Sequence, residues 1–362
     1  MDIQDRIVSH FPEIGEVKEI LPLTSGLINQ TYWVKTMDPE EPDYVLQRIN
    51  HQIFTDVDML QRNIDLVTSH IRKRLQAQGV TDLDRKVLRF LKTDEGKNYV
   101  YDEETGYWRV SVYIQGSKTM SEVTPESSYL VGLKFGEFEA MLADIPETLG
   151  DTIPNFHNME FRLQQLRDAV AANPAGRLQE VSDLVEAIEK DAEEMCLAER
   201  LYREGKLPKR ICHCDTKVSN MLFDMEDNVL CVIDLDTVMP NFVCSDVGDF
   251  LRSAANTAPE DEPDLDKIAF RMDVFRSFIR GYLESARCFL TDQEIALLSF
   301  SAMLFPYMQA VRFLTDYING DTYYQIQYPT HNCVRAKAQF DFYQKVKAKR
   351  DEMEAYIASL LK

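Results

Sequence analysis

Three polar residues near the middle of the chain have the types and the spacing of a metal site built from oxygen ligands. The segment 213–220 reads HCDTKVSN and contains Asp215 and Asn220, and Asp234 follows at the end of a later apolar run. Carboxylate and amide oxygens suit Mg²⁺, which prefers oxygen ligands and usually completes its shell with substrate phosphates. These residue types therefore point to magnesium-assisted chemistry on a phosphate group.

The sequence between these residues predicts a β-hairpin that would position them. Two apolar runs, 221–223 and 229–233, flank a polar turn at 224–228. Asn220 and Asp234 are equally distant from the turn centre near Asp227. Antiparallel pairing would therefore bring these two side chains together at the open end of the hairpin.

The loop, the hairpin and the second acidic motif together resemble the catalytic core of protein-kinase-like phosphotransferases. The loop reads H-x-D-x-K-x-x-N and the later motif reads I-D-x-D, as in kinases of the aminoglycoside phosphotransferase and choline kinase type. The resemblance implies that Asp215 accepts the proton of a substrate hydroxyl and that Asn220 and Asp234 bind metal. Asp236 is either a further metal ligand or a turn residue. Lys217 would neutralise the transferring phosphoryl group, and a solvated surface lysine is the alternative.

Three cysteines near His213 raise the question of a zinc site. Structural zinc usually takes four ligands in spacings such as C-x₂₋₄-C, whereas a single residue separates Cys212 from Cys214. Strand alternation would point Cys231 into the apolar core, so we expect buried, reduced thiols. His213 is expected to pack under the loop and to orient it.

Composition limits the partners and the compartment. The chain has 362 residues, 45% hydrophobic content and a formal charge of −20 at pH 7. Such a field repels nucleic acid and anionic membrane surfaces, whereas Mg²⁺ and local cations would still permit ATP to bind. The N-terminus does not resemble a signal peptide, and the apolar runs are too short to span a bilayer. With seven irregularly spaced cysteines, we expect a reduced, cytoplasmic protein that binds neither membrane nor nucleic acid.

A turn near the N-terminus supplies candidates for holding the ATP phosphates. It separates two strand-like segments, 19–23 and 31–35, and in kinase-like folds such a turn covers the phosphates with backbone N–H groups. Its candidate residues are Thr24, Ser25, Gly26 and Asn29. An ordinary hairpin turn is the alternative, since the segment contains only one glycine.

The strand expected at 44–50 carries Arg48. This residue matches the cation that choline kinase-like relatives present to the α- and β-phosphates, and its planar fork suits a pair of phosphate oxygens. A surface arginine is the alternative. Apolar residues of 53–71 recur at spacings of three and four and predict an amphipathic helix. The usual acidic partner of the strand cation is not obvious on this helix, where Asp58 is the candidate.

Residues 113–116 stand where the hinge between two lobes is expected. The backbone of Tyr113, Ile114 and Gln115 would meet the adenine edge, and the lobe boundary is placed near Gly116. We therefore predict an α+β, protein-kinase-like fold of two lobes. Residues 1–115 would form a small, mainly antiparallel-β nucleotide-binding lobe with one helix. Residues 116–362 would form a large helical catalytic lobe that carries the hairpin.

Periodicity predicts the remaining elements. Residues 84–112 indicate a strand meander that includes 87–93. Helices are expected near 2–11, 125–143, 178–203, 268–289, 292–317 and 334–361. Gly132 and Gly136 are four residues apart and would permit a close contact with another helix. Asp246 lies at the start of a further helix. Either the helix dipole favours an acidic residue there, or Asp246 braces the catalytic loop.

Seven segments spread over residues 21–340 narrow the resemblance to the N-acetylhexosamine 1-kinases. They are LPLTSGLINQTYWV, YVLQRIN, TIPNFHN, CHCDTKVSNMLFD, VLCVIDLDTVMP, VRFLTDYINGDTYY and YPTHNCVRAKAQ. The resemblance implies ATP-dependent phosphorylation of the anomeric hydroxyl of N-acetylglucosamine or N-acetylgalactosamine. It also implies a sugar site in the C-terminal lobe, with Asp215 at the acceptor hydroxyl.

The same resemblance indicates residues that contact the sugar. The candidates are Arg312, Tyr323, Tyr324, His331, Asn332 and Arg335. The first two are preferred, and for each residue a structural tie between helices is the alternative. Two other functions stay open. One is a kinase of another small alcohol, such as an aminoglycoside held by the acidic loop 260–266, and the other is a non-catalytic nucleotide-binding regulator.

Overall fold

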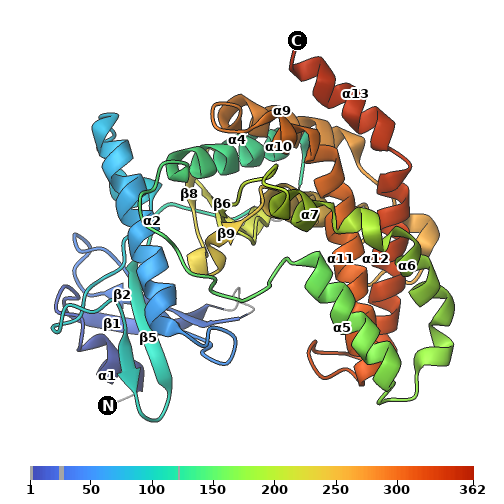
Figure 1. The fold of residues 1–362 in the computed structure, drawn as a ribbon. Helices are drawn as coiled ribbons and strands as arrows, with labels where there is room; N and C mark the ends of the chain where they lie inside the picture. Colours follow the sequence, from blue (N-terminus) through green and yellow to red (C-terminus); the bar gives the residue numbers. More distant parts are fainter. Residues whose placement is uncertain (1–2, 24–27, 121–122) are drawn as a thin grey trace. The chain divides into compact units, whose positions relative to one another are not determined.

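The computed structural model describes residues 3–23, 28–120 and 123–362, which form two compact units (Figure 1). The first unit lies within residues 1–120, 144–154 and 219–239. The second lies within residues 121–143, 155–218 and 240–362. The hairpin residues fall in the first unit, so the two units differ from the predicted lobes 1–115 and 116–362. The division into a nucleotide-binding lobe and a catalytic lobe stays a prediction.

A five-stranded antiparallel sheet is the centre of the first unit, with strand order β1-β2-β3-β5-β4. Its strands are β1 Val17–Leu23, β2 Gln30–Thr36, β3 Tyr44–Arg48, β4 Val100–Asp102 and β5 Gly106–Val112. Val34, Leu46 and Val110 are buried in one core, and helix α1 (Ile3–Val8) packs against it. Alternate side chains of a strand point to the same face, which is why these strands could be predicted from their apolar pattern.

Helix α2 (Val57–Ala77) follows the first three strands. It begins after Asp56, whose carboxylate accepts the backbone N–H of Met59 at 2.9 Å and so satisfies one exposed donor of the first turn. The predicted apolar face is confirmed for Leu60, Ile64, Val67 and Ile71, which are buried. Ile53 was predicted on the same face, but it precedes the helix and is 37% exposed.

The strand predicted at 87–93 is wrong. A short helix, α3 (Leu83–Lys86), precedes this segment, which forms only the isolated bridge between Phe90 and Ser111. Strand β4 already pairs with the first residues of β5. The segment therefore has only the last residues of β5 as partners, and it does not form a regular strand.

The predicted hairpin is present as β7 (Met221–Phe223) and β8 (Val229–Val232). Its register places Met221 opposite Val232. One residue further from the turn, the Ile233 N–H donates to Asn220 O at 2.9 Å. Asn220 thus lies opposite Ile233, and Asp234 follows one residue later. The expected pairing of Asn220 with Asp234 is shifted by one residue, because the strands pair about a centre just before Asp227.

Helices make up most of the second unit. They are α4 Pro125–Leu142, α5 Met159–Ala172, α6 Ser182–Met195, α7 Leu197–Arg203, α8 Cys244–Ala254, α9 Met272–Ala286, α10 Asp292–Ala296, α11 Leu298–Asn319, α12 His331–Lys347 and α13 Arg350–Leu360. Two short strands, β6 (Arg210–Cys212) and β9 (Met239–Asn241), pair with each other. Helix α4 packs along α9, and α11 packs along α12 (Figure 1). None of the described helices has the length and apolar character needed to cross a membrane. The predicted α+β class is confirmed.

Glycines allow α4 and α9 to approach each other closely. A Cβ added to Gly132 would lie 2.2 Å from Phe278 O, and one added to Gly281 would lie 2.1 Å from Tyr129 O. Backbone oxygens cannot move away at low cost, so only glycine fits at these positions. The close helix contact expected from Gly132 and Gly136 is confirmed.

Three helices predicted as continuous are interrupted. The segment 178–203 begins with the 3₁₀ turn Leu178–Glu180 and breaks at Cys196, 292–317 breaks at Leu297, and the last helix breaks before Arg350. Cys196 and Leu297 have ψ angles of 14° and 0°, outside the usual helical range. Apolar periodicity continues through each break, so it does not reveal the change of direction.

Candidate active site

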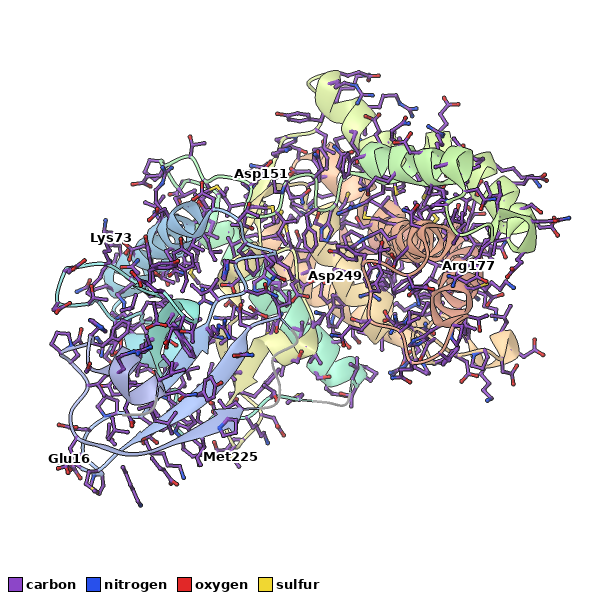
Figure 2. All side chains as sticks on the ribbon, turned by 90° about the horizontal axis from the view of Figure 1, so that it is seen from below. Glu16, Lys73, Asp151, Arg177, Met225 and Asp249 are labelled. Carbon is purple, nitrogen blue, oxygen red and sulfur yellow. The ribbon has the colours of Figure 1, made fainter. Side chains whose placement is uncertain are left out.

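Helix α8 holds the backbone of the loop that follows β6. Asp246 accepts the N–H groups of His213 and Cys214, both at 2.7 Å. Asp249, labelled in Figure 2, accepts the N–H of Thr216 at 2.9 Å. Both carboxylates are buried, so the loop is fixed on both sides of its central acidic residue. These contacts correspond to the bracing role considered for Asp246.

That central residue, Asp215, forms an ion pair with Lys217. The ammonium nitrogen lies 2.7 Å from Asp215 Oδ1. Burial lowers the pKa of Lys217, but the carboxylates of Asp215 and Asp249 outweigh this effect, and the pKa is raised. Lys217 therefore keeps its charge beside the candidate base, as a residue that neutralises a phosphoryl group should. The ion pair with Asp215 favours this role over the alternative of a solvated surface lysine.

His213 lies under the loop and is fully buried. Its ring packs edge to face against Phe135 and Phe138 of α4, with centroid distances of 5.5 and 5.9 Å. The N–H of Asp215 donates to its Nδ1 at 3.3 Å. His213 thus orients the loop through packing and one backbone contact.

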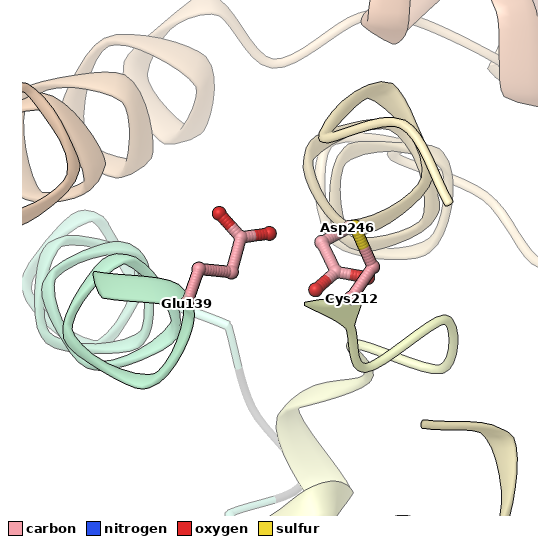
Figure 3. A group of neighbouring side chains, drawn as sticks. All are labelled: Glu139, Cys212 and Asp246. Carbon is pink, nitrogen blue, oxygen red and sulfur yellow. The ribbon is translucent and has the colours of Figure 1, made fainter. Parts of the chain in front are cut away.

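A buried acidic pair lies behind the loop. Glu139 of α4 faces Asp246 of α8 and Cys212 of β6 (Figure 3), and one polar atom of each lies within 4.8 Å of the others. The hydroxyl of Tyr282 donates to Glu139 Oε2. Burial first, and then the charge of Asp246, raise the pKa of Glu139 well above its usual value. Burial and the neighbouring carboxylate therefore favour the protonated form of Glu139.

A proton accounts for this cluster better than a metal ion does. Both oxygens of Asp246 already accept backbone N–H groups, and the cluster offers one sulfur where structural zinc sites usually have several sulfur or nitrogen ligands. Glu139 Oε1 is buried and has no hydrogen-bond partner in the described part of the chain, so this oxygen is where a proton would lie. Burial raises the pKa of the Cys212 thiol well above its usual value. Cys214 and Cys231 are also buried, and none of the seven cysteines is in a disulfide.

The candidate metal ligands belong to the first unit, whereas Asp215 and Lys217 belong to the second. Asn220 is buried at the end of the 3₁₀ turn Val218–Asn220. Asp234 has φ 60° and ψ 59°, the left-handed conformation that Asp and Asn tolerate better than most residues. An amide oxygen and a carboxylate at the open end of one hairpin form a donor set that fits Mg²⁺.

Asp236 has partners that occupy its carboxylate. Its Oδ1 lies 2.5 Å from Nη1 of Arg109 in β5, and neither side chain is more than 3% exposed. Asn29 donates to Oδ2 at 2.6 Å. Arg109 also donates from Nε to Gln47 Oε1 at 3.0 Å. Asp236 therefore joins the turn after Asp234 to the sheet, and its contacts favour this role over metal binding.

Sequence reasoning missed this ion pair, although a signal was present. Arg109 lies between apolar residues in a strand whose side chains are almost all buried. A buried arginine needs an anionic or hydrogen-bonding partner, so its position in this strand implied a buried acid nearby.

Of the phosphate-binding candidates, Thr24, Ser25 and Gly26 lie outside the described residues. Asn29 is described, and besides contacting Asp236 it accepts the N–H of Asn50 at 2.9 Å. It therefore fixes the end of the turn between β1 and β2. Its direct contact with nucleotide stays a prediction.

Arg48 lies opposite Gln30 of β2 and Trp108 of β5 in the sheet register. Its Nε donates to Thr105 O at 2.5 Å, and it lines a cavity of about 180 Å³. Asp58 accepts the hydroxyl of Tyr99 at 2.5 Å, and no ion pair joins it to Arg48 in the described residues. Arg48 is thus available at a cavity, as a phosphate-binding residue should be.

The expected hinge residues make several intramolecular contacts. Tyr113 stacks on Trp33 with a centroid distance of 5.1 Å. The carbonyl of Ile114 accepts the hydroxyl of Ser117 at 2.6 Å, and that of Gln115 accepts Nη1 of Arg85 at 2.5 Å. Recognition of the adenine edge by this backbone stays a prediction.

The preferred acceptor-binding residues come together in the second unit. A pocket of about 220 Å³ is lined by Arg162, Gln165, Arg312, Thr315, Asp316, Asn319, Thr322, Tyr323 and Tyr324. The guanidinium of Arg312 lies 6.0 Å from the ring centroid of Tyr323 and 5.6 Å from that of Tyr324. Arg162 was not anticipated, because an arginine on an amphipathic helix carries no distinguishing sequence signal.

The other three sugar candidates contact neighbouring parts of the chain. The His331 ring lies 3.0 Å from Asp261, and Asn332 donates to two buried or half-buried carboxylates at 2.9 Å. Arg335 donates to Gln325 O at 3.1 Å. These contacts favour the alternative considered for them, and none of the three lines the pocket of Arg312.

Comparison with known proteins agrees with this geometry. Residues 19–283 match the phosphotransferase enzyme family (APH), which is more than half of the chain. An aminoglycoside phosphotransferase from Alicyclobacillus acidocaldarius is 15% identical, with a TM-score of 0.58, over 100% of this chain and 96% of the other. A choline kinase from Cryptosporidium parvum is 16% identical, with a TM-score of 0.57, over 100% of both chains.

A third solved structure with a similar fold is a kinase of a different small alcohol. The ethanolamine kinase of Plasmodium vivax is 15% identical, with a TM-score of 0.53, over 90% of this chain and 84% of the other. Identities this low support a shared fold and leave the acceptor open. The family match places the chain in the phosphotransferase enzyme family (APH), and the aminoglycoside phosphotransferase and the choline kinase share its fold.

Proposed function

We propose that this phosphotransferase transfers the γ-phosphoryl group of ATP to the anomeric hydroxyl of N-acetylglucosamine or N-acetylgalactosamine. The observation that carries the proposal is the pocket that Arg312, Tyr323 and Tyr324 line together, in the segment that resembles the N-acetylhexosamine 1-kinases. A guanidinium offers only donors, which suit sugar oxygens and an acetamido carbonyl. The tyrosines add rings and hydroxyls for the remaining sugar surface.

Each candidate residue has a chemical role in this reaction. Asp215 would orient the anomeric hydroxyl and accept its proton, and Lys217 would stabilise the negative charge of the transferring group. Arg48 and the turn after β1 would hold the triphosphate. Asn220 and Asp234 would hold Mg²⁺, which supplies charge neutralisation at the phosphate oxygens. Catalysis would consist mainly of positioning and electrostatic stabilisation.

A kinase of another small alcohol is the second candidate, since aminoglycoside, choline and ethanolamine kinases share the fold. Such amines are usually bound by carboxylates. The acidic loop that could hold a polycation has its first carboxylates engaged, because Glu260 lies 3.3 Å from Arg252 and Asp261 lies 3.0 Å from His331. This engagement favours the neutral sugar over the aminoglycoside.

A non-catalytic regulator is disfavoured, because the candidate base and metal ligands are all present in the sequence. As an enzyme with seven cysteines outside disulfides, the protein is expected to work in the cytoplasm, where thiols stay reduced.

The proposal is tested by phosphate transfer to a panel of acceptors. The purified protein is incubated with MgATP and N-acetylglucosamine, N-acetylgalactosamine, kanamycin or choline, and ³¹P NMR locates the phosphate in each product. We expect sugar 1-phosphates, formed about 10²–10⁴-fold more slowly by Asp215→Asn, which controls for contaminating kinases. A 6-phosphate, or turnover of kanamycin without turnover of sugars, contradicts the proposal.

A further inference from the structure

Two arginines from different helices line the same pocket. Arg162 belongs to α5 and Arg312 to α11. Arg162 donates to Gln165 Oε1 and to Phe156 O, both at 2.9 Å, and Arg312 donates to Gln309 Oε1 at 3.3 Å. These contacts to neutral oxygens fix the orientation of the guanidinium groups without neutralising them.

Among the described residues, no carboxylate forms an ion pair with either guanidinium. Across residues 3–23, 28–120 and 123–362, most arginines form ion pairs, and the ion pairs include neither Arg162 nor Arg312. Arg162 Nε is buried and has no acceptor in this part of the chain. A protein with a formal charge of −20 thus keeps two arginines without acidic partners at one pocket.

Asp316 is the acidic residue among those that line the pocket, and its oxygens are already occupied. Oδ1 accepts the N–H groups of Thr322 and Tyr323 at 2.9 and 2.8 Å. Oδ2 accepts the N–H of Tyr324 and the side-chain amide of Asn332, both at 2.9 Å. Asp316 is 4% exposed and holds the loop after α11, so an entering ligand would meet the two guanidinium groups instead.

The nearby His157 adds no further charge. Burial, and then the charges of Arg312 and Arg162, hold the pKa of His157 well below its usual value, so the ring stays neutral. Burial and the repulsion from Arg312 lower the pKa of Arg162 to about 10, which still leaves it charged at neutral pH. Two guanidinium groups thus share the pocket lining with a single carboxylate, that of Asp316, whose oxygens are engaged by N–H groups.

We propose that Arg162 acts with Arg312 as a charge filter, which makes the pocket reject ammonium-bearing alcohols and accept alcohols that present carbonyl or other uncharged oxygens. This proposal rests on the proposed function for the location of the acceptor. It assigns Arg162 as a specificity-determining residue that works by repelling the wrong acceptor as well as by binding the right one. A desolvated guanidinium discriminates strongly, because a like charge brought into a partly buried site is poorly screened.

Two sugars that differ at one nitrogen provide the sharpest test. N-acetylglucosamine carries a neutral amide where glucosamine carries an amine, which is protonated at a pH below the pKa of its ammonium form. We expect the wild-type protein to prefer the amide by at least about 100-fold in kcat/KM. Arg162→Gln should reduce this preference by about tenfold or more, mainly through a lower KM for glucosamine, whereas Arg162→Lys should retain most of it.

A matched control comes from the same helix. Arg167 of α5 does not line the pocket and pairs with Glu189 at 2.8 Å. Arg167→Gln removes the same charge from α5 and should leave the preference unchanged. An equal loss of preference in Arg167→Gln would show a general effect of net charge and would overturn the filter, as would an unchanged preference in folded Arg162→Gln.

Measurements of amine binding test the charge filter independently of the proposed function. Calorimetry with choline, ethanolamine and glucosamine does not require turnover, and we expect each amine to bind Arg162→Gln more tightly than the wild type. Tighter binding to the wild type overturns the filter even if sugars are phosphorylated. Phosphorylation of another neutral alcohol, with no reaction of either N-acetylhexosamine, overturns the proposed function and leaves the filter standing.

Discussion

The guanidinium of Arg109 and the carboxylate of Asp236 form an ion pair of 2.5 Å inside the first unit, with side chains that are 2% and 3% exposed. The pair connects the turn that carries Asp234 to β5, and Asn29 extends the connection to the turn between β1 and β2. The position of a candidate metal ligand therefore depends on a buried charge pair.

Breaking this pair from one side should destabilise the protein strongly. Asp236→Ala leaves Arg109 charged and buried, and we expect a loss of about 3–5 kcal/mol in the free energy of unfolding. The double variant Arg109→Met/Asp236→Leu should lose much less, because it removes both charges. Urea unfolding followed by circular dichroism measures the difference. Unchanged stability of Asp236→Ala with weaker Mg²⁺ binding would instead identify Asp236 as a metal ligand.

The raised pKa of Glu139 predicts a pH dependence of stability. In the folded protein, burial and the charge of Asp246 raise the pKa of Glu139 well above 4.5, the ordinary value near which it ionises in the unfolded chain. The folded state binds the extra proton, so its contribution to stability is fully present below about pH 4.5 and is lost as the pH rises toward the folded pKa. Glu139→Gln carries a neutral donor at every pH and should flatten the decline of Tm above about pH 5.

The neighbouring Glu137 provides the control for this measurement. It lies on the same helix, is partly exposed and pairs with Lys134 at 3.1 Å. Glu137→Gln should leave the pH profile of Tm unchanged. If Glu139 bound a metal ion instead, Glu139→Gln would lower Tm at every pH, and a chelator would lower the Tm of the wild type.

Asp215 should be essential for turnover and dispensable for nucleotide binding. Asp215→Asn preserves the shape of the side chain and removes the base, so kcat should fall by about 10²–10⁴-fold. The Kd for MgATP, measured by calorimetry, should change little. A kcat near the wild-type value would remove Asp215 from the proposed mechanism.

The two candidate metal ligands should differ in importance. Asp234→Ala removes a charged ligand and should abolish activity, whereas Asn220→Ala removes a neutral ligand and should leave some activity. Activity measured over a range of Mg²⁺ concentrations ranks them. Full rescue of Asp234→Ala at high Mg²⁺, with Asn220→Ala still inactive, would reverse this order.

Arg312 should affect the acceptor and spare the nucleotide. Arg312→Met removes a donor to a buried substrate oxygen, which typically costs about 1–3 kcal/mol. We expect kcat/KM for the sugar to fall by roughly ten- to a hundredfold. The Kd for MgATP should stay close to the wild-type value. Equal losses for both substrates would point to a general structural defect.

Local pattern was enough to predict much of the fold. Strand-like apolar segments located β1, β2 and β3, the spacing of apolar residues located α2, and the turn between two apolar runs located the hairpin. The breaks at Cys196 and Leu297 were missed, because the apolar pattern continues on both sides of each break.

Some residues of the candidate site could likewise be predicted from the sequence, and others could not. The loop and hairpin residues could be predicted because their types and spacing lie within one short segment. The partners of Asp236 and Arg312 could not, since Arg109 and Arg162 lie more than a hundred residues away along the chain. The pattern of a single sequence does not indicate which distant residues lie together, except where a charged residue in an apolar strand implies a partner.

Asp234 and Cys214 share a backbone feature with an evolutionary consequence. Their φ angles are 60° and 62°, in the left-handed region that glycine adopts without cost. Replacing either by glycine should relieve strain on the order of 1 kcal/mol. Asp234→Gly would therefore keep this backbone conformation while removing a candidate metal ligand, so a selection that scores folding alone would tolerate the change, and only a screen that also scores turnover would keep the aspartate.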